Sequence, residues 1–135
     1  MSHFTRVRTA LRDADLLVSA LGAAGFGTVE VHDAPQTLYG YQGDARPERA
    51  EVIVRRAHLG TASNDLGFRR TDDGTFEAII SDYDRRQYSE AWLGTVSQHY
   101  AHAATLRYAQ DNGFEVATEE RDADGTLRLT LRRFT

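Results

Sequence analysis

Residues 89–133 limit the possible folds of this chain more than any other part, because they join one long amphipathic helix to a β-hairpin. Ser89 is a favoured N-cap residue, and Asn112 followed by Gly113 ends the helix, since glycine adopts the left-handed conformation without a steric cost. Apolar and polar side chains then alternate around a turn at 122–125, which predicts two paired strands. One stripe of the helix is apolar and is expected to face a core: Trp92, Leu93, Val96, Tyr100 and Ala103, with Leu106 at its edge.

Length and composition are typical of a globular protein. A chain of 135 residues with 41% hydrophobic residues is expected to form a single domain over residues 1–135. The absence of cysteine excludes disulfides, thiol catalysis and cysteine-ligated metal centres formed by this chain. A formal net charge of -4 disfavours nucleic acid as a partner. No apolar run reaches the length of a membrane span and no signal segment is visible, so we expect a cytoplasmic protein without a membrane partner.

The N-terminal half predicts a strand, a helix and two further strands. A strand at 3–9 is followed by Asp13, which can cap a helix that Gly25 and Phe26 end. Gly22 weakens that helix and therefore suggests close packing at its position. The apolar residues of the helix recur at helical spacing: Leu17, Ala20, Leu21 and Ala24.

Two strands are expected after that helix, at 28–32 and 50–56. Asp33 and Pro35 are expected to end the first of them. The intervening segment 34–48 contains both prolines and is expected to be irregular or an edge strand.

The order of the elements predicts an α+β fold. Residues 66–70 and 75–82 are expected to form a hairpin around a turn at 71–74, with Phe76, Ala78 and Ile80 on one face. The chain thus reads strand, helix, strand, strand, hairpin, helix, strand, strand. Because the strands alternate, we expect a two-layer sandwich, with a largely antiparallel sheet that carries two helices on one face. The other face is expected to meet water or a partner. The two similar helix endings, Gly25-Phe26 and Gly113-Phe114, suggest a duplicated βαββ unit.

Several short motifs along nearly the whole chain resemble one known family. They are Met1-Ser2-His3-Phe4-Thr5, Tyr39-Gly40-Tyr41, Asp65-Leu66-Gly67-Phe68-Arg69-Arg70, Tyr100-Ala101, Gly113-Phe114 and Asp124-Gly125-Thr126-Leu127-Arg128-Leu129. Together they are similar to the hypothetical chloroplast reading frame thirty-five family, a bacterial and plastid domain of unknown function. The resemblance implies an accessory or adaptor role, with an AAA-type ATPase as the candidate partner. It carries no catalytic residues over to this chain, and segments 34–49 and 61–64 depart from the family pattern.

Loop residues supply the first candidate binding groups, and each has a structural alternative. Tyr39 and Tyr41 can form an exposed aromatic contact surface, although rings in such a loop often fold onto the core. Asp82 and Asp84 flank Tyr83 and could hold a hard cation through oxygen. Two carboxylates are too few for such a site, so a solvated charge cluster is the simpler interpretation.

Arginine and histidine residues supply the remaining candidates. Arg69 and Arg70 can contribute to an arginine-rich sheet face for an anionic ligand or an acidic partner, although pairing with nearby Glu and Asp residues is simpler. His99 and His102 have a spacing compatible with two ligands of one metal ion, but the sequence shows no clear third ligand. We therefore predict neither a metal nor a cofactor.

Two functions of different classes follow from these candidates. The sequence has no phosphate-binding glycine loop, nucleophile elbow or zinc motif, which favours a non-enzymatic adaptor that binds a protein partner. The open sheet face and the loop at 39–41 would then be the contact surface. The alternative is a small-molecule sensor or a small enzyme with a pocket near the link from hairpin to helix. That pocket would use Asp82, Tyr83, Arg70 and His99.

Overall fold

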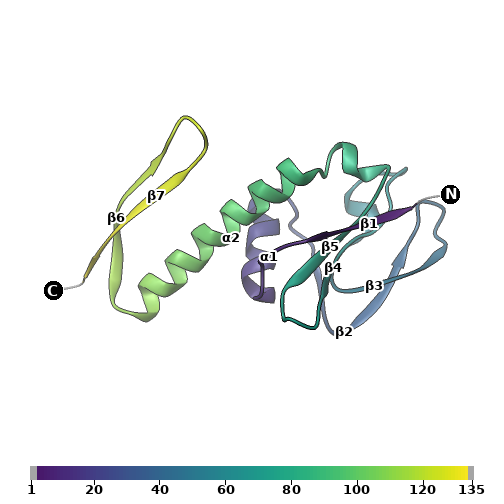
Figure 1. The fold of residues 1–135 in the computed structure, drawn as a ribbon, viewed down its shortest axis with the longest axis horizontal. Helices are drawn as coiled ribbons and strands as arrows, with labels where there is room; N and C mark the ends of the chain where they lie inside the picture. Colours follow the sequence, from purple (N-terminus) through teal and green to yellow (C-terminus); the bar gives the residue numbers. More distant parts are fainter. Residues whose placement is uncertain (1–2, 134–135) are drawn as a thin grey trace.

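The computed structural model describes residues 3–133, which contain two α-helices and seven strands. Figure 1 shows how these elements are arranged. Met1, Ser2, Phe134 and Thr135 of the expected domain lie outside the described residues. All strand pairs are antiparallel, which confirms the predicted α+β class. The elements are β1 (Phe4–Arg8), α1 (Ala14–Ala23), β2 (Glu30–Tyr39), β3 (Ala45–Val54), the 3-10 turn η1 (Arg56–His58), β4 (Leu66–Arg70), β5 (Phe76–Ser81), the 3-10 turn η2 (Asp84–Arg86), α2 (Glu90–Asp111), β6 (Phe114–Arg121) and β7 (Leu127–Arg133).

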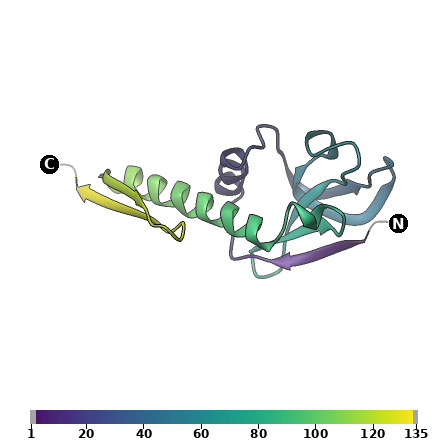
Figure 2. The ribbon, with the colours of Figure 1, turned by 90° about the horizontal axis from the view of Figure 1, so that it is seen from above.

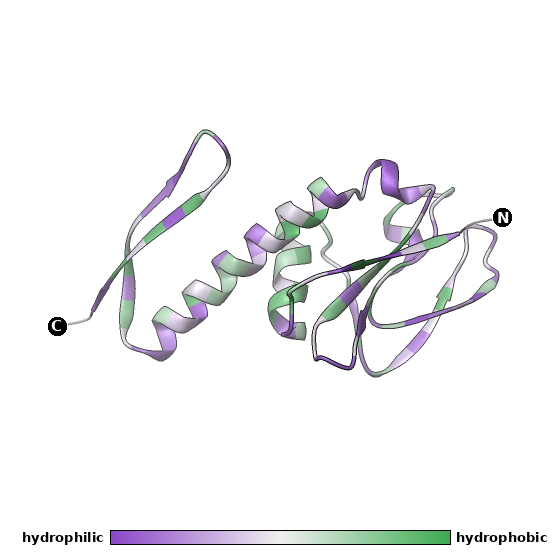
Figure 3. Cartoon of the chain, viewed as in Figure 1, coloured by the Kyte–Doolittle hydropathy of each residue, from purple (hydrophilic) through white to green (hydrophobic). Residues whose placement is uncertain are grey.

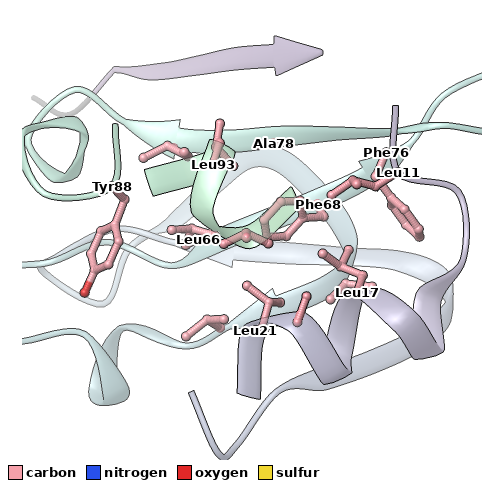
Figure 4. Close-up of a cluster of buried hydrophobic side chains, with 14 residues drawn as sticks. Leu11, Leu17, Leu21, Leu66, Phe68, Phe76, Ala78, Tyr88 and Leu93 are labelled. Carbon is pink, nitrogen blue, oxygen red and sulfur yellow. The ribbon is translucent and has the colours of Figure 1, made fainter. Parts of the chain in front are cut away.

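The main sheet has five strands in the order β1-β5-β4-β3-β2. The hairpin of β4 and β5 forms its centre, with Gly67 paired to Ile79 and Phe68 paired to Ala78. Phe76, Ala78 and Ile80 share one face of β5, as their alternation predicted, and all three are buried. Figure 4 shows this face packed against residues of both helices, including Leu17 and Leu21 of α1 and Leu93 of α2.

Both helices begin as the sequence predicted. The Asp13 carboxylate accepts a 3.0 Å hydrogen bond from the Leu16 N–H, and the Ser89 hydroxyl accepts one of 3.3 Å from the Trp92 N–H. The bond from Leu16 also contributes most to holding the pKa of Asp13 below its ordinary value. At the end of α1, Gly25 has a φ of 112°, which allows the Phe26 N–H to donate to the Leu21 carbonyl.

Two details of the helix predictions are wrong. A Cβ added at Gly22 would meet nothing within 4 Å, so no close packing demands glycine there. Leu106 is 41% exposed, because α2 has passed the edge of the main sheet by that point. The apolar stripe of α2 therefore meets the core only in its first half, where Leu93 and Val96 are buried.

The second face of the main sheet is not left open, contrary to the sequence-based expectation. Leu38 and Ala50 of the β2–β3 hairpin are fully buried there beside Ile53 and Ile79, and Phe4 packs against them. A Cβ at Gly67 would lie 2.7 Å from the Ala50 Cβ, so only glycine lets the hairpin come this close. The β2–β3 hairpin thus covers part of the face that the pattern of alternation assigned to water.

Strand β2 continues past Pro35, although the sequence predicted that it would end there. The pairing with β3 shifts register between Val31 and Gln36, and Pro35 lies within that bulge. A bulged residue is not required to donate a ladder hydrogen bond, so the missing N–H of proline does not end the strand. Segment 34–48 was expected to be irregular or an edge strand. The edge strand is confirmed for its first part, because β2 is the outer strand of the main sheet and extends to Tyr39.

Strands β6 and β7 form a separate two-stranded sheet and do not join the main one. Helix α2 has 22 residues and carries the hairpin beyond the main sheet, as Figure 1 and Figure 2 show. Figure 3 shows apolar and polar segments alternating along β7. The leucines of β7 are partly exposed, and Leu127 and Leu129 line a depression together with residues of α2. Helix α2 and this hairpin together form the arm of the molecule. Neither helix described in residues 3–133 is long and apolar enough to cross a membrane.

Candidate functional site

Three of the predicted site residues lie together at one end of the main sheet. Tyr39 is the last residue of β2, Tyr41 lies in the turn that follows, and Tyr83 follows β5. The three side chains are 40%, 40% and 55% exposed, and we call them the tyrosine rim. Asn64 connects the two segments, because its Oδ1 accepts a hydrogen bond from the Tyr41 N–H while its own N–H donates to Asp84, the neighbour of Tyr83.

A buried polar cluster supports the rim from below. Its members Asn64, Ser81 and Asp84 are at most 4% exposed. The Asp84 Oδ2 atom accepts hydrogen bonds of 2.6 Å from the Ser81 hydroxyl and 3.0 Å from the Asn64 N–H. The Asn64 side-chain amide also donates to the Ser81 oxygen at 2.9 Å. These bonds satisfy the buried carboxylate and fix the link from β5 to α2 against the loop at 59–65.

Asp65, 1% exposed, is the second buried carboxylate of this region and holds Tyr39 in place. Its Oδ2 atom accepts from the Tyr39 N–H and from Arg55 Nη1, each at 2.8 Å, and its Oδ1 accepts from the Arg56 N–H at 2.7 Å. The Arg55 guanidinium lies 5.6 Å from the centre of the Tyr39 ring, a cation–π distance. Asp65 therefore positions both the backbone of Tyr39 and the cation that contacts its ring.

Arg55 extends this network to Glu30 at the start of β2. Arg55 donates to both oxygens of the Glu30 carboxylate, at 2.8 Å and 2.9 Å. These hydrogen bonds outweigh the opposing effect of burial and lower the pKa of Glu30 to about 2. His32 Nε2 lies 2.8 Å from the same carboxylate and adds to this effect.

A shallow depression of about 350 Å³ lies beside Tyr83. It is lined by the loop at 59–63 on one side and by Tyr83, Asp84, Arg86 and Gln87 on the other. Asp84 already accepts three protein hydrogen bonds, so Arg86 is the charged group of the lining most accessible to a ligand. The depression coincides with the link at which the sequence predicted a pocket.

Other predicted site residues do not converge on this place. Arg70 lies at the far end of β4, where it donates to the Arg12 and Gly74 carbonyls, and its guanidinium is 4.2 Å from the centre of the Phe76 ring. Arg69 lies opposite Glu77 in the register of β4 and β5. His99 is half-buried in the middle of α2. Asp82 does adjoin the rim, and its carboxylate accepts a 2.8 Å hydrogen bond from the Thr5 hydroxyl.

The residues that hold the site together were not among the sequence candidates. They are Asn64, Asp65 and Ser81. Asn64 and Ser81 are seventeen residues apart and meet only because β4 and β5 pair in a particular register. The one local sign was Asn64-Asp65 directly before a buried strand, where a polar pair often satisfies backbone groups at the strand end.

The buried polar groups of the site are engaged within the protein. Its two buried carboxylates accept hydrogen bonds from protein donors, and the Ser81 hydroxyl donates to one of them, Asp84. Within residues 3–133, no three His, Asp or Glu side chains gather closely enough to bind a metal ion. The tyrosine rings are the exposed aromatic groups of the site.

Comparison with known proteins places the chain in one family. A family described as "Protein of unknown function (DUF1257)" matches residues 27–130. The chain is similar to proteins named "Uncharacterized protein ycf35" from Cyanophora paradoxa, at 26% identity, and Guillardia theta, at 27% identity; each alignment covers 99% of this chain and 98% of the relative. No solved structure matches the chain. Since the family match spans most of the sequence, the chain belongs to the DUF1257 family, which confirms the resemblance seen in its motifs.

Proposed function

We propose that this protein is a non-enzymatic adaptor and that it binds a protein partner through the tyrosine rim. The observation that carries this proposal is the combination of three exposed tyrosine rings with a backbone held by buried hydrogen bonds. Tyrosine is enriched at protein interfaces because it buries a large area and loses little side-chain entropy. A rim with these properties supports binding more than catalysis.

The buried network lowers the entropic cost of binding. The Tyr39 N–H donates to Asp65 and the Tyr41 N–H donates to Asn64, in addition to the backbone bond from the Gly40 N–H to the Asp44 carbonyl that closes the turn. A contact surface that is already ordered does not pay this cost when the partner arrives. Backbone bonds alone could close this turn. The additional side-chain bonds therefore support a role in ordering the two tyrosines before a partner binds.

The partner class follows from the resemblance, which makes an AAA-type ATPase the first candidate to test. The test begins with affinity purification from the native host, followed by mass spectrometry. The variant carries Tyr39→Ala, Tyr41→Ala and Tyr83→Ala. The matched control is Tyr108→Ala, because Tyr108 is 56% exposed but lies on the second half of α2, away from the rim.

Binding is then measured with the purified partner by titration calorimetry. We expect the rim variant to weaken binding at least about tenfold, which corresponds to about 1.4 kcal/mol, while the control binds like the wild type. Equal affinities for the rim variant and the wild type, with the fold intact by circular dichroism, would overturn the proposal.

The depression beside Tyr83 supports a second candidate function, a small-molecule sensor. Its volume of about 350 Å³ is at the lower limit of ordinary ligand pockets. A thermal-shift screen of metabolites tests this function, with Ala62→Trp as the blocking variant because Ala62 lines the depression and is exposed. A ligand whose effect is lost in Ala62→Trp supports the sensor. Partner binding that survives the same substitution supports the adaptor.

A further inference from the structure

We propose that the free edge of β1 binds an extended segment of a partner protein as an added strand, and that this segment alternates acidic and apolar residues. Strand β1 is an outer strand of the main sheet and pairs only with β5 among residues 3–133, as Figure 2 shows. This surface is separate from the tyrosine rim, so the inference does not depend on the proposed function.

The hydrogen-bonding groups of the edge can be assigned from the register. The Asp82 N–H donates to the His3 carbonyl and the Thr9 N–H donates to the Phe76 carbonyl, so residues 3 and 9 bond to β5. Bonding alternates along an antiparallel pair. The backbone groups of Phe4, Arg6 and Arg8 therefore face away from β5 and are available to an added strand.

Charge on one side of the edge selects the side chains of the added strand. Arg6 and Arg8 lie on the face opposite the helices, and Arg69 lies on the same face two strands away. The nearest carboxylate, Glu77, lies 3.3 Å from Arg6, and Arg8 has no carboxylate partner within residues 3–133. Asp72 and Asp73 belong to the turn beyond Arg8, where Asp73 accepts hydrogen bonds from Thr71 and Thr75. The excess of arginine along β1 favours acidic residues opposite it.

The other side of the edge borders a groove of about 430 Å³ between β1 and α2. Its lining is mixed: Val7, Ala10 and Leu93 are apolar, and Arg8, Thr9, Glu90 and Ser97 are polar. Val7 packs against the core, and Leu93 is 6% exposed. Glu90, in the wall of the groove, would repel a second carboxylate on this side. Because side chains alternate across a strand, the added segment carries acidic residues on the arginine side and apolar residues on the groove side.

A second copy of β1 is a poorer occupant than such a segment. An antiparallel pair of two β1 strands centred on Arg6 would place two Arg6 side chains opposite each other and each Arg8 opposite Phe4. Like charges directly opposite each other are destabilising. Pairing between two copies of β1 is thus disfavoured, whereas an acidic strand is complementary to this edge.

The test uses a capped peptide of alternating Glu and Val residues as the probe and the full-length protein. Nuclear magnetic resonance measures amide hydrogen exchange at single residues, with and without the peptide. We expect exchange to slow about tenfold or more at Phe4, Arg6 and Arg8, and to change little at Thr5 and Val7, which already bond to β5. The same peptide with a central proline cannot donate along the edge and is expected to give no protection.

Two protein variants separate charge selection from general electrostatic attraction. Arg8→Glu is expected to weaken peptide binding at least about tenfold, whereas Arg49→Glu, an equal charge change at an exposed site on β3, leaves binding unchanged. The inference is overturned if the peptide binds without protecting Phe4, Arg6 and Arg8, if both variants bind alike, or if millimolar peptide causes no change. It is also overturned if these amides are protected without peptide in a sample of twice the monomer mass, because a second copy would then occupy the edge.

Discussion

The Ser81 hydroxyl donates a 2.6 Å hydrogen bond to the Asp84 carboxylate, and both side chains are buried below the loop that carries Asn64. Ser81 is the last residue of β5 and Asp84 begins η2, so this bond fixes the angle at which the chain leaves the sheet. Tyr83 lies between the two residues and is turned outward, at 55% exposure. The position of an exposed rim residue is thus set by two buried neighbours.

Replacing Asp84 tests how much this bond contributes to stability. Asp84→Asn keeps the shape of the side chain but removes the negative charge that strengthens the hydrogen bonds from the Asn64 N–H and the Ser81 hydroxyl. We expect the free energy of unfolding to fall by about 2–4 kcal/mol, measured by urea denaturation. The control is Asp82→Asn, at an exposed residue that accepts from Thr5, with an expected loss of at most about 1 kcal/mol. Equal losses in the two variants would contradict a special role for the buried carboxylate.

The Glu30–Arg55 pair predicts a pH dependence of stability. The pKa of Glu30 is about 2 in the folded protein and is taken as 4.5 without its partners, so the ionised pair stabilises the fold above pH 4.5 and is lost as the pH falls toward 2. The carboxylate is 38% exposed, and solvent screening limits its contribution to about 1 kcal/mol.

The measurement compares the wild type with Glu30→Gln in urea titrations between pH 6 and pH 3. The stability difference is expected to shrink as the pH falls, because protonated Glu30 then resembles glutamine. Asp65 and His32 face the same network and remain in both proteins. A difference that is constant over this range would show that the pair does not have the assigned pKa.

Periodicity in the sequence was sufficient for the elements whose neighbours are local. The alternation of Phe76, Ala78 and Ile80 and the capping by Asp13 and Ser89 each depend on residues a few positions away, and the structure confirms them. The polar cluster could not be predicted in this way. Asn64 and Asp84 are twenty residues apart, and their contact requires the register of β4 and β5, which hydrophobic spacing does not specify precisely.

The covered second face of the sheet escaped prediction for a related reason. Leu38 can pack against β4 only because Gly67 has no side chain. The sequence does not reveal this contact, because a glycine within a strand is equally typical of a bulge. A pattern of alternation describes which face is apolar but not which distant segment covers it. Duplication of the βαββ unit stays a prediction, since the order of elements agrees with it while β6 and β7 pair only with each other.

Substitutions at two glycines test the packing of the β2–β3 hairpin. Gly67→Ala would place a Cβ 2.7 Å from the Ala50 Cβ and 3.1 Å from Leu38, and we expect a loss of about 1–3 kcal/mol in stability. Gly22→Ala meets nothing within 4 Å in α1 and is expected to raise stability by about 0.4–1 kcal/mol. Thermal and urea unfolding of the two variants should therefore move in opposite directions. A stabilising Gly67→Ala would mean that the hairpin does not press against β4.

The arm is expected to open more easily than the main sheet. No residue of β6 or β7 belongs to either buried cluster of residues 3–133, and a two-stranded sheet on its own is marginally stable. Hydrogen exchange followed by mass spectrometry should show faster exchange in peptides from 114–133 than in those from 66–81.

A matched pair of substitutions tests the same expectation through stability. Leu129→Ala, in the partly exposed row of β7, should cost less than about 1 kcal/mol, while Ile79→Ala, at a fully buried site, should cost about 2–5 kcal/mol. Similar losses of stability in the two variants, together with similar exchange rates in the two segments, would show that the hairpin unfolds together with the five-stranded sheet.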